Sequence, residues 1–379
     1  MIPYPARRWV CFLASMGRFC VNTVASGLVG TGLVGTCLVG TGVGGAVGAI
    51  AATAAEVRDS GSVTGVQRDA SAQDGAGLRV DASRNPGCLS ADPFAREELA
   101  KDIEFLAGDA MQGRSPGSPG DIRARAFIAD RFRCVGLSTG SADNFNQPFT
   151  TSDGKRTGNV VGYVPGTDLA AEIIVVGAHH DHLGVKDGRV FNGANDNATG
   201  VAALLAVAQA VVRREPPPRR TIAFVAFGFE EHQGRCEGSE FYVKHSPDAL
   251  PIGNVVYMVN SDMLGTYPVG GLTAFGALPG TPARSILLDL LPAYASLDVR
   301  LGRTPQRNDS DFQAFCDRGI PYIYLETWDP QCHHKSCDEA ARIDYPSLSI
   351  IARLLGDVVD KLGDTNSKLA GVVHKGCER

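Results

Sequence analysis

Histidine and acidic residues cluster in one stretch of the sequence, residues 177–200, which reads GAHHDHLGVKDGRVFNGANDNATG. His179 and Asp181 come directly after an apolar run, and Asp196 comes directly before an alanine-rich segment. Imidazole and carboxylate groups without a thiolate are typical ligands of a borderline metal ion such as zinc. The stretch therefore predicts a metal site that carries out a reaction.

Further candidate ligands follow other predicted strands. We predict strands at residues 159–163, 173–178, 221–227, 255–259 and 322–325. After the last three come Glu230 and Glu231, then Asp262, and, through a loop, His334. The carboxyl ends of parallel strands meet at one edge of a sheet, where binding sites form. A carboxylate shared by two sets of ligands can hold two ions about 3.5 Å apart, which together bind a carbonyl and generate hydroxide near neutral pH.

The adjacent pair Glu230 and Glu231 predicts a division of roles. Neighbouring side chains at a strand end point in different directions, so one can bind metal while the other accepts the proton of the attacking water. Asp181 lies two residues after His179 on the same side of the strand, which predicts that its carboxylate orients the histidine ring. The alternative for Asp181 is a carboxylate that stabilises the loop. We predict that His182 is a structural neighbour of the site rather than a ligand.

Helical patterns alternate with the predicted strands. Apolar residues recur at helical spacing at 94–106, 124–135, 198–213, 238–245, 282–294 and 346–361. This alternation predicts an α/β fold with a mostly parallel central sheet and helices on both faces. One domain over residues 92–362 accommodates all of these elements.

The first 55 residues differ in composition from this domain. Residues 19–55 carry no charge, and LVGTG, LVGTC and LVGTG stand in tandem at 28–42. From this composition we predict that residues 1–55 are an export signal. An N-terminal membrane anchor is the second interpretation, and a misassigned start codon is the third. Residues 56–91 predict a disordered linker, and residues 363–379 predict a loose tail. We therefore expect the domain to be exported: secreted, periplasmic or anchored outside the cytoplasm.

Composition and cysteine spacing limit the classes of function. The formal net charge of −5 gives no basic excess that would favour nucleic acid. The ten cysteines show no paired CxxC spacing of a zinc ribbon. Cys332 and Cys337 closely flank His334, which fits either a local disulfide or two reduced thiols. The seven cysteines after residue 55 are odd in number, so at least one stays free or pairs outside the chain.

Five motifs in their order along the chain resemble peptidase family M28, the co-catalytic zinc aminopeptidases. They are GAHHDHLG, NGANDNATG, GFEEHQG, NSDMLG and HHKSCD. The earlier EFLAGDAMQGRSPGSPG resembles the family's N-terminal helix and GRxPG loop. The resemblance covers residues 95–360 and implies a zinc-exopeptidase-like three-layer sandwich with two Zn²⁺ per chain. It also implies a cis peptide bond between Asp196 and Asn197.

The resemblance assigns roles residue by residue. It implies that Glu230 is the general base and that Asp181 is the carboxylate orienting a ligand. His334 is preferred over His333 because Asp338 stands four residues later, as in the family's HxxxD. The implied metal ligands are His179, Asp196 (bridging the two ions), Glu231, Asp262 and His334.

Two positions depart from the family pattern. Asn195 stands where many members have aspartate, but that position is not an expected ligand. Phe312 replaces the histidine of an SDH motif, which concerns contacts with the substrate rather than the metals.

The predicted function is a zinc-dependent aminopeptidase acting on peptides or proteins. One alternative is a glutaminyl-cyclase-like acyltransferase with a single zinc, although the retained pair His179 and Asp262 favours two metals. Another alternative is a carboxypeptidase, which would need a cation to hold the substrate's C-terminal carboxylate. The candidates for that cation are Arg303, Arg307 and Lys335. A non-catalytic binding ectodomain is the third alternative.

Overall fold

The computed structural model describes residues 89–140, 144–232, 236–307 and 309–369. The predicted signal or anchor at residues 1–55 lies outside these ranges, as do nearly all of the predicted linker and most of the predicted tail. Within the described ranges, no helix combines the length and the apolar character that a membrane span requires.

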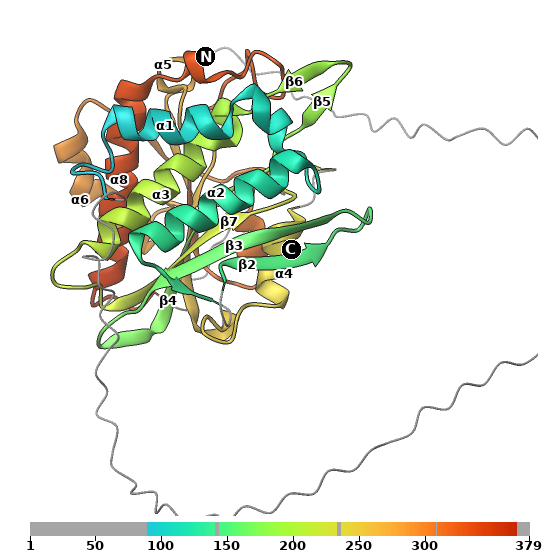
Figure 1. The fold of residues 1–379 in the computed structure, drawn as a ribbon. Coiled ribbons are helices and arrows are strands. Elements are labelled where there is room, and N and C mark those ends of the chain that lie inside the picture. Colours follow the sequence, from blue (N-terminus) through green and yellow to red (C-terminus); the bar gives the residue numbers. More distant parts are fainter. Residues whose placement is uncertain (1–88, 141–143, 233–235, 308, 370–379) are drawn as a thin grey trace, which may run out of the picture. The chain divides into compact units, whose positions relative to one another are not determined.

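A nine-stranded sheet forms the centre of the described domain (Figure 1). The strand order is β1-β3-β7-β4-β8-β11-β9-β10, with β2 paired beside β3. The middle strands β7, β4, β8 and β11 are parallel, whereas β3 joins β7 and β9 joins β11 in antiparallel orientation. The strands are β1 (Ser138–Thr139), β2 (Asn146–Thr150), β3 (Arg156–Val164), β4 (Leu169–His179), β7 (Arg220–Phe227), β8 (Val255–Ser261), β9 (Leu272–Phe275), β10 (Val299–Arg303) and β11 (Tyr322–Glu326). The predicted fold class is confirmed, and the antiparallel flanks add pairings that the sequence did not predict.

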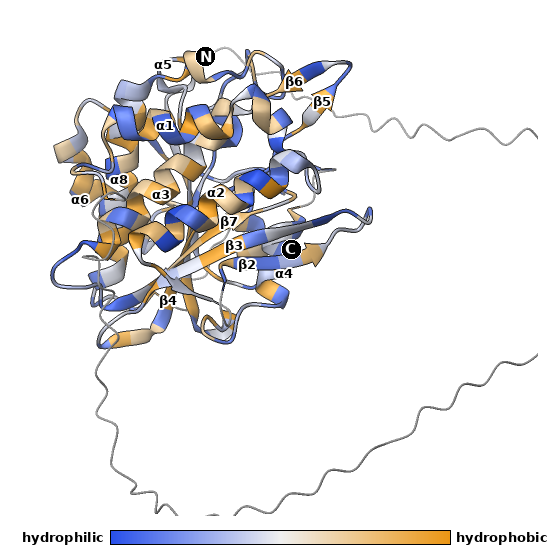
Figure 2. Cartoon of the chain, in the orientation of Figure 1, coloured by the Kyte–Doolittle hydropathy of each residue, from blue (hydrophilic) through white to orange (hydrophobic). Residues whose placement is uncertain are grey.

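Side chains alternate between the two faces of this sheet, which gives the domain three layers. In β4, Ile174 and Val176 belong to one apolar core, and Ile173 and Val175 belong to a second core on the opposite face. This alternation follows from the period of two in a strand. Because both faces are covered, the central strands are apolar along their length, as the orange colour of β7 shows in Figure 2.

Helices cover both faces of the sheet. α1, α2, α3, α6 and α8 pack on the side of the first core, and α4 and α7 pack on the side of the second. α3 lies between the sheet and the helices α1, α2 and α8, which is why it is apolar on nearly all sides. The helices are α1 (Arg96–Leu106), α2 (Pro119–Val135), α3 (Thr199–Val212), α4 (Glu237–Lys244), α5 (Tyr267–Gly270), α6 (Pro282–Leu290), α7 (Phe312–Cys316) and α8 (Tyr345–Asp364).

The first turn of α2 is fixed against the end of β4. The Ser118 side chain accepts a hydrogen bond from the Asp121 amide at 3.2 Å, and Pro119 occupies the first helical position. The Asp121 carboxylate lies 3.2 Å from Nε2 of His180, the residue after β4. The cap of this helix therefore helps to position the strand end that carries the predicted site.

A short hairpin interrupts the motif-rich stretch between its histidines and Asp196. Its strands are β5 (Gly184–Lys186) and β6 (Arg189–Phe191). The two turn residues, Asp187 and Gly188, have φ of 51° and 72°, the left-handed values that a tight two-residue turn needs. The sequence prediction did not include this hairpin.

The packed C-terminal segment extends beyond the predicted domain end at residue 362. α8 continues to Asp364, whose carboxylate accepts hydrogen bonds from Arg214 and from the Arg219 amide. Leu369 has no exposed surface. The prediction of a loose tail from residue 363 is therefore wrong for residues 363–369.

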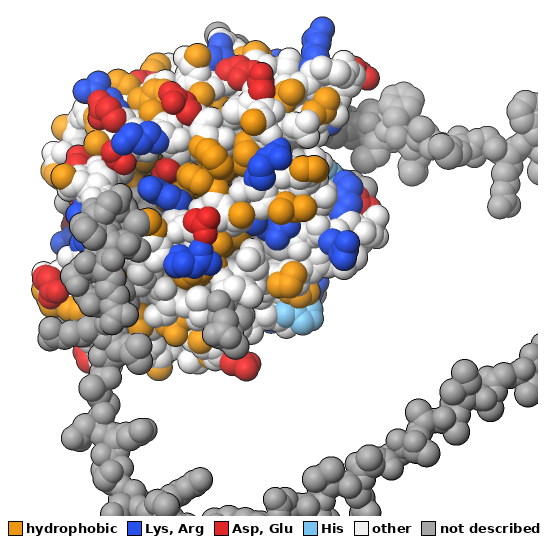
Figure 3. All heavy atoms as spheres, in the orientation of Figure 1, with side chains coloured by type: hydrophobic (Ala, Val, Ile, Leu, Met, Phe, Trp, Pro, Cys, Tyr) orange, Lys and Arg blue, Asp and Glu red, His pale blue; other side chains and the backbone are white. Residues whose placement is uncertain are grey.

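The face of the domain seen in Figure 3 carries charges of both signs among apolar side chains, over α1 and α2. A nucleic-acid surface is instead marked by clustered Lys and Arg. The mixed charges on this face agree with the small negative net charge of −5.

Candidate metal centre

The candidate site lies at the carboxyl ends of the parallel strands. β4 ends at His179, and β8 ends one residue before Asp262. Glu230 and Glu231 follow β7 after a short turn, and His334 lies in the loop after β11. The predicted strands thus deliver the predicted side chains to one edge of the sheet.

One group of potential ligands consists of His179, Asp196 and Asp262. Nε2 of His179 lies 3.1 Å from Oδ1 of Asp262 and 3.3 Å from Oδ1 of Asp196. All three residues are buried, and their potential ligand atoms lie within 4.8 Å of one another. This group could hold one metal ion.

A second group surrounds the other carboxylate oxygen of Asp196. Nε2 of His334 lies 3.3 Å from Oδ2 of Asp196 and 2.7 Å from Oε2 of Glu231. Nε2 of His333 lies 3.5 Å from the same Asp196 oxygen, so His333 remains an alternative to His334 as the ligand. The five predicted ligands therefore converge, and Asp196 stands between the two groups.

His182 contacts Glu231 rather than standing apart from the site. Its Nδ1 lies 2.7 Å from Oε1 of Glu231 and 3.9 Å from Asp196. Because Oε1 is held by His182, the other Glu231 oxygen faces His334. His182 was predicted as a neighbour of the site rather than a ligand, and the structure places it close enough to form a potential metal group with Asp196 and Glu231.

Glu230 lies in the site with its side chain 12% exposed, and it belongs to none of the potential metal groups among the described residues. One carboxylate oxygen lies 3.9 Å from Nε2 of His179, and the other lies 3.7 Å from the Cys236 sulfur. Burial raises the pKa of Glu230 well above its usual range, and Glu231 raises it further, although His179 lowers it. A carboxyl group with a raised pKa is suited to accept a proton.

Asp181 occupies a different position from the one predicted. Its carboxylate lies 3.9 Å from Nδ1 of His179, whereas its main-chain oxygen lies 3.2 Å from that nitrogen. The carboxylate instead accepts hydrogen bonds from the amides of Glu230, at 3.0 Å, and Glu231, at 3.4 Å. Asp181 therefore holds the turn after β7, which is the loop-stabilising alternative.

The turn that carries Asp196 is held by side chains on both sides. Asp338 accepts the amides of Asn195 and Asp196 at 2.7 and 3.0 Å. Oδ1 of Asn195 accepts the Gly265 amide, and its Nδ2 donates to Thr266. The Thr266 hydroxyl donates to the Thr327 carbonyl, so it accepts from Asn195, and a carboxylate at this position could not make that donation. The Asp196–Asn197 peptide bond is cis, as the resemblance implied.

The second departure, Phe312, lies away from the ligands. It is buried and stacks on Tyr322 and Tyr324, at ring distances of 4.4 and 5.4 Å. The preceding residue, Asp311, is fully buried, and burial raises its pKa to about 7. The substitution therefore extends the apolar core on this face.

Cysteine pairing is settled for the loop that carries His334. Cys332 and Cys337 form a disulfide, so the alternative of two reduced thiols is excluded. Among the described cysteines, Cys236 is free and buried. A free cysteine agrees with the odd number expected after residue 55.

Arg114 supports the site in a way that sequence reasoning missed. Its buried guanidinium donates to four main-chain oxygens, at distances of 2.6–2.9 Å. The acceptors are Leu106, His180, Asn192 and Gly193. Burial lowers its pKa to about 10, so it stays charged at neutral pH beside the carboxylates of the site. The only signal was its place in the GRSPG loop.

Replacing Arg114 with methionine should destabilise the protein by roughly 3 kcal/mol or more, because four buried carbonyls lose their donor. Lysine should recover only part of this loss, since a single ammonium cannot span the same acceptors. Urea unfolding measures the effect, and Arg123→Met on the exposed side of α2 is the matched control. An unchanged unfolding midpoint in Arg114→Met would contradict this role.

The fold and the site define an α/β protein with a buried centre of histidines and carboxylates that could hold two metal ions. Residues 159–359, more than half of the chain, match Peptidase family M28, and the chain therefore belongs to this family.

Named relatives and a solved structure extend this finding. The chain is 27% identical over 292 residues to a glutaminyl-peptide cyclotransferase from Boiga irregularis, covering 64% of this chain and 75% of the relative. It is 29% identical over 267 residues to leupeptin-inactivating enzyme 1 from Streptomyces exfoliatus, covering 65% and 56%. Its fold is similar to that of BSAP, a zinc aminopeptidase from Bacillus subtilis, with a TM-score of 0.58, 16% identity, and coverage of 74% and 99%.

Proposed function

We propose that this chain is a zinc aminopeptidase with two metal ions that releases N-terminal residues from peptides. The observation that carries the proposal is the position of Asp196. Its Oδ1 faces His179 and its Oδ2 faces His334, so one carboxylate serves two groups of ligand atoms. The donor atoms are imidazole nitrogens and carboxylate oxygens, which fit Zn²⁺.

The residues of the site divide the reaction between them. Two bound Zn²⁺ ions would polarise the scissile carbonyl and lower the pKa of the attacking water. Glu230 would accept the proton of that water and pass it to the leaving amine. Asp181 fixes the amides of Glu230 and Glu231, so the base and the ligand keep separate directions.

A second candidate function is glutaminyl cyclisation. The observation that favours it is the 27% identity to a glutaminyl-peptide cyclotransferase. We place it second because the predicted ligands of both metal positions lie together here. Carboxypeptidase activity has less support, because two of the three candidate anchors, Arg307 and Lys335, are engaged elsewhere. Arg307 pairs with Asp317 at 3.0 Å, and Lys335 donates to the Gln331 carbonyl at 2.5 Å.

The test is a substrate panel measured before and after zinc removal. We expect cleavage of unblocked aminoacyl substrates, no cleavage of N-acetylated ones, complete loss after chelation, and recovery when two zinc ions per chain are returned. Release of pyroglutamyl product from N-terminal glutamine, without hydrolysis of other substrates, would instead establish the cyclase. Full activity after verified removal of all metal would contradict both the aminopeptidase and the cyclase proposal.

We further propose that the protein acts outside the cytoplasm. The uncharged residues 19–55 and the disulfide between Cys332 and Cys337 support this location, because disulfides persist mainly in oxidising compartments. Fractionation of cells that express the full chain tests it.

A further inference from the structure

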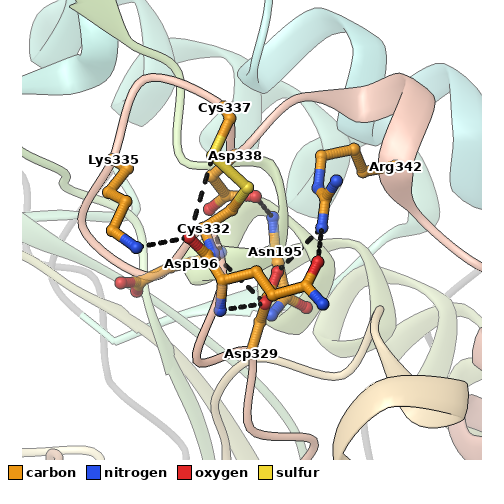
Figure 4. The surroundings of a disulfide bond; sticks show 9 residues. Asn195, Asp196, Asp329, Cys332, Lys335, Cys337, Asp338 and Arg342 are labelled. Atoms are coloured by element: carbon orange, nitrogen blue, oxygen red, sulfur yellow. Dashed lines mark hydrogen bonds and ion pairs between the residues drawn. A yellow bond between two sulfur atoms is a disulfide. The ribbon is translucent and has the colours of Figure 1, made fainter.

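The loop that carries His334 is closed by the disulfide between Cys332 and Cys337 (Figure 4). Within this ring lie His333 and His334, whose Nε2 atoms face Oδ2 of Asp196. Asp338, the residue directly after the ring, accepts the amides of Asn195 and Asp196. The disulfide therefore borders contacts to both the carboxylate and the main-chain amide of the bridging residue Asp196.

Main-chain turn bonds also hold this loop: the His333 amide donates to the Asp329 carbonyl at 3.1 Å, and the Lys335 amide donates to the Cys332 carbonyl at 2.9 Å. Its residues form turns, without a helix or strand, in the described segment between β11 and α8. His334 has a φ of 57°, a left-handed conformation that non-glycine residues rarely adopt, and its side chain is 45% exposed. Asp329 accepts the amides of Gln331 and Cys332 at the start of the ring, and Asp338 holds the end of the ring to the Asn195 and Asp196 amides. Between these two ends, the covalent closure adds a restraint on the turn that carries His334.

Two members of the other group of ligands, His179 and Asp262, do not depend on this loop. His179 ends a central strand and has no exposed surface. Asp262 directly follows β8, and its Oδ2 accepts a hydrogen bond from Ser310 at 2.7 Å. Sheet and core packing hold these two residues, so loss of the disulfide should leave them in position.

We propose that Cys332 and Cys337 are positioning residues for one of the two metal positions, the one formed by Asp196, Glu231 and His334, and that reducing their disulfide weakens that position selectively. This inference rests on the di-zinc function proposed above. Loss of groups that orient ligands typically lowers metal affinity about 10–100-fold, and we expect a change of that size at one position.

The reduction itself is ordinary chemistry at an accessible bond. Cys337 is exposed, so a reductant can reach its sulfur. A phosphine and one water molecule supply two electrons and two protons, the S–S bond breaks to two thiols, and the phosphine becomes its oxide. A dithiol does the same and becomes a disulfide.

The main experiment compares the wild-type chain with Cys332→Ala/Cys337→Ala by zinc titration at buffered free zinc. Alanine is used because a remaining thiol could itself bind zinc. We expect two tight sites in the wild type, and in the variant one tight site and one weakened about 10–100-fold. Ser336→Ala lies in the same ring, keeps the disulfide and should bind as the wild type does.

A second comparison separates positioning from general stability. In a His334→Ala background, removing both cysteines should cause a much smaller further loss of zinc affinity, because the main residue through which they act is absent. A merely structural disulfide would weaken binding equally in both backgrounds.

The outcomes distinguish this inference from the proposed function. Two sites of wild-type affinity in the double cysteine variant, or equal weakening of both, would overturn the inference and leave the di-zinc function standing. A wild-type chain that binds no zinc would overturn both. If the variant does not fold, folded zinc-loaded wild type is treated with a phosphine, and release of one zinc ion per chain, rather than none or two, is the supporting result.

Discussion

Replacing Glu230 with glutamine should leave two zinc ions bound and lower kcat by about 10²–10⁴-fold. Glutamine keeps the size of the side chain but cannot accept the proton of the attacking water. The metals should remain because Glu230 belongs to none of the potential metal groups that the described residues form. KM should change less, since the bound metals still hold the substrate carbonyl. Metal analysis and steady-state kinetics on the same preparation measure both quantities.

The matched variant Glu231→Gln should behave in the opposite way. Its two carboxylate oxygens each lie 2.7 Å from a histidine nitrogen, Oε1 from His182 and Oε2 from His334. A glutamine would turn an NH₂ group toward one of these positions, so the zinc content should fall. Any loss of activity should then follow from the missing zinc rather than from a missing proton acceptor. If Glu230→Gln loses zinc while Glu231→Gln keeps it, the two roles are reversed. A fully active, zinc-loaded Glu230→Gln would refute the general-base role.

The strands that carry the site were predictable because they are buried on both faces. Such strands have continuous apolar runs, and the polar residue that ends each run marks the edge where ligands gather. His179 and Asp262 follow two of these runs, and the structure brings them within 3.1 Å of each other. The bridging role of Asp196 was predicted from the resemblance to family M28. Neither charge nor spacing shows which carboxylate contacts both groups of ligands.

The flanking strands escaped prediction for a physical reason. β9 has only four residues, and β10 is half exposed with two arginines in five residues. Neither has the apolar run or the clean alternation that marks a strand. Their strand conformation is accompanied by ladder pairing that the sequence pattern does not reveal, of β9 with β11 and of β10 with β9.

The role of Asp181 could not be read from strand periodicity. The argument that placed its carboxylate beside His179 assumes that the strand continues, but β4 ends at His179. Beyond that residue the chain turns, and the carboxylate reaches the amides of Glu230 and Glu231 instead. Arg114 was hidden for a similar reason, because its acceptors include oxygens 66–79 residues away in the sequence.

Replacing Asp196 with asparagine should remove both zinc ions and, with them, nearly all activity. Asp196 takes part in every potential metal group among the described residues. Its Oδ1 lies 3.3 Å from Nε2 of His179, and its Oδ2 lies 3.3 Å from Nε2 of His334. Asparagine is neutral and offers only one oxygen, so one metal position loses its ligand and the other loses the charge of a shared carboxylate. We expect the affinity for zinc to fall by more than about 100-fold, beyond the range for groups that only orient ligands.

Asp338→Asn provides the matched control for this prediction. Asp338 touches no predicted ligand atom but accepts the amides of Asn195 and Asp196, so it orients the bridging residue through the main chain. Its loss should lower zinc affinity about 10–100-fold, less than the loss of the bridge itself. Zinc titration and aminopeptidase assays on Asp196→Asn and Asp338→Asn show which variant loses more zinc affinity and activity. If Asp196→Asn retains two zinc ions at wild-type affinity, or loses only the ion near His334, then Asp196 does not bridge the two positions and the di-zinc arrangement proposed here is wrong.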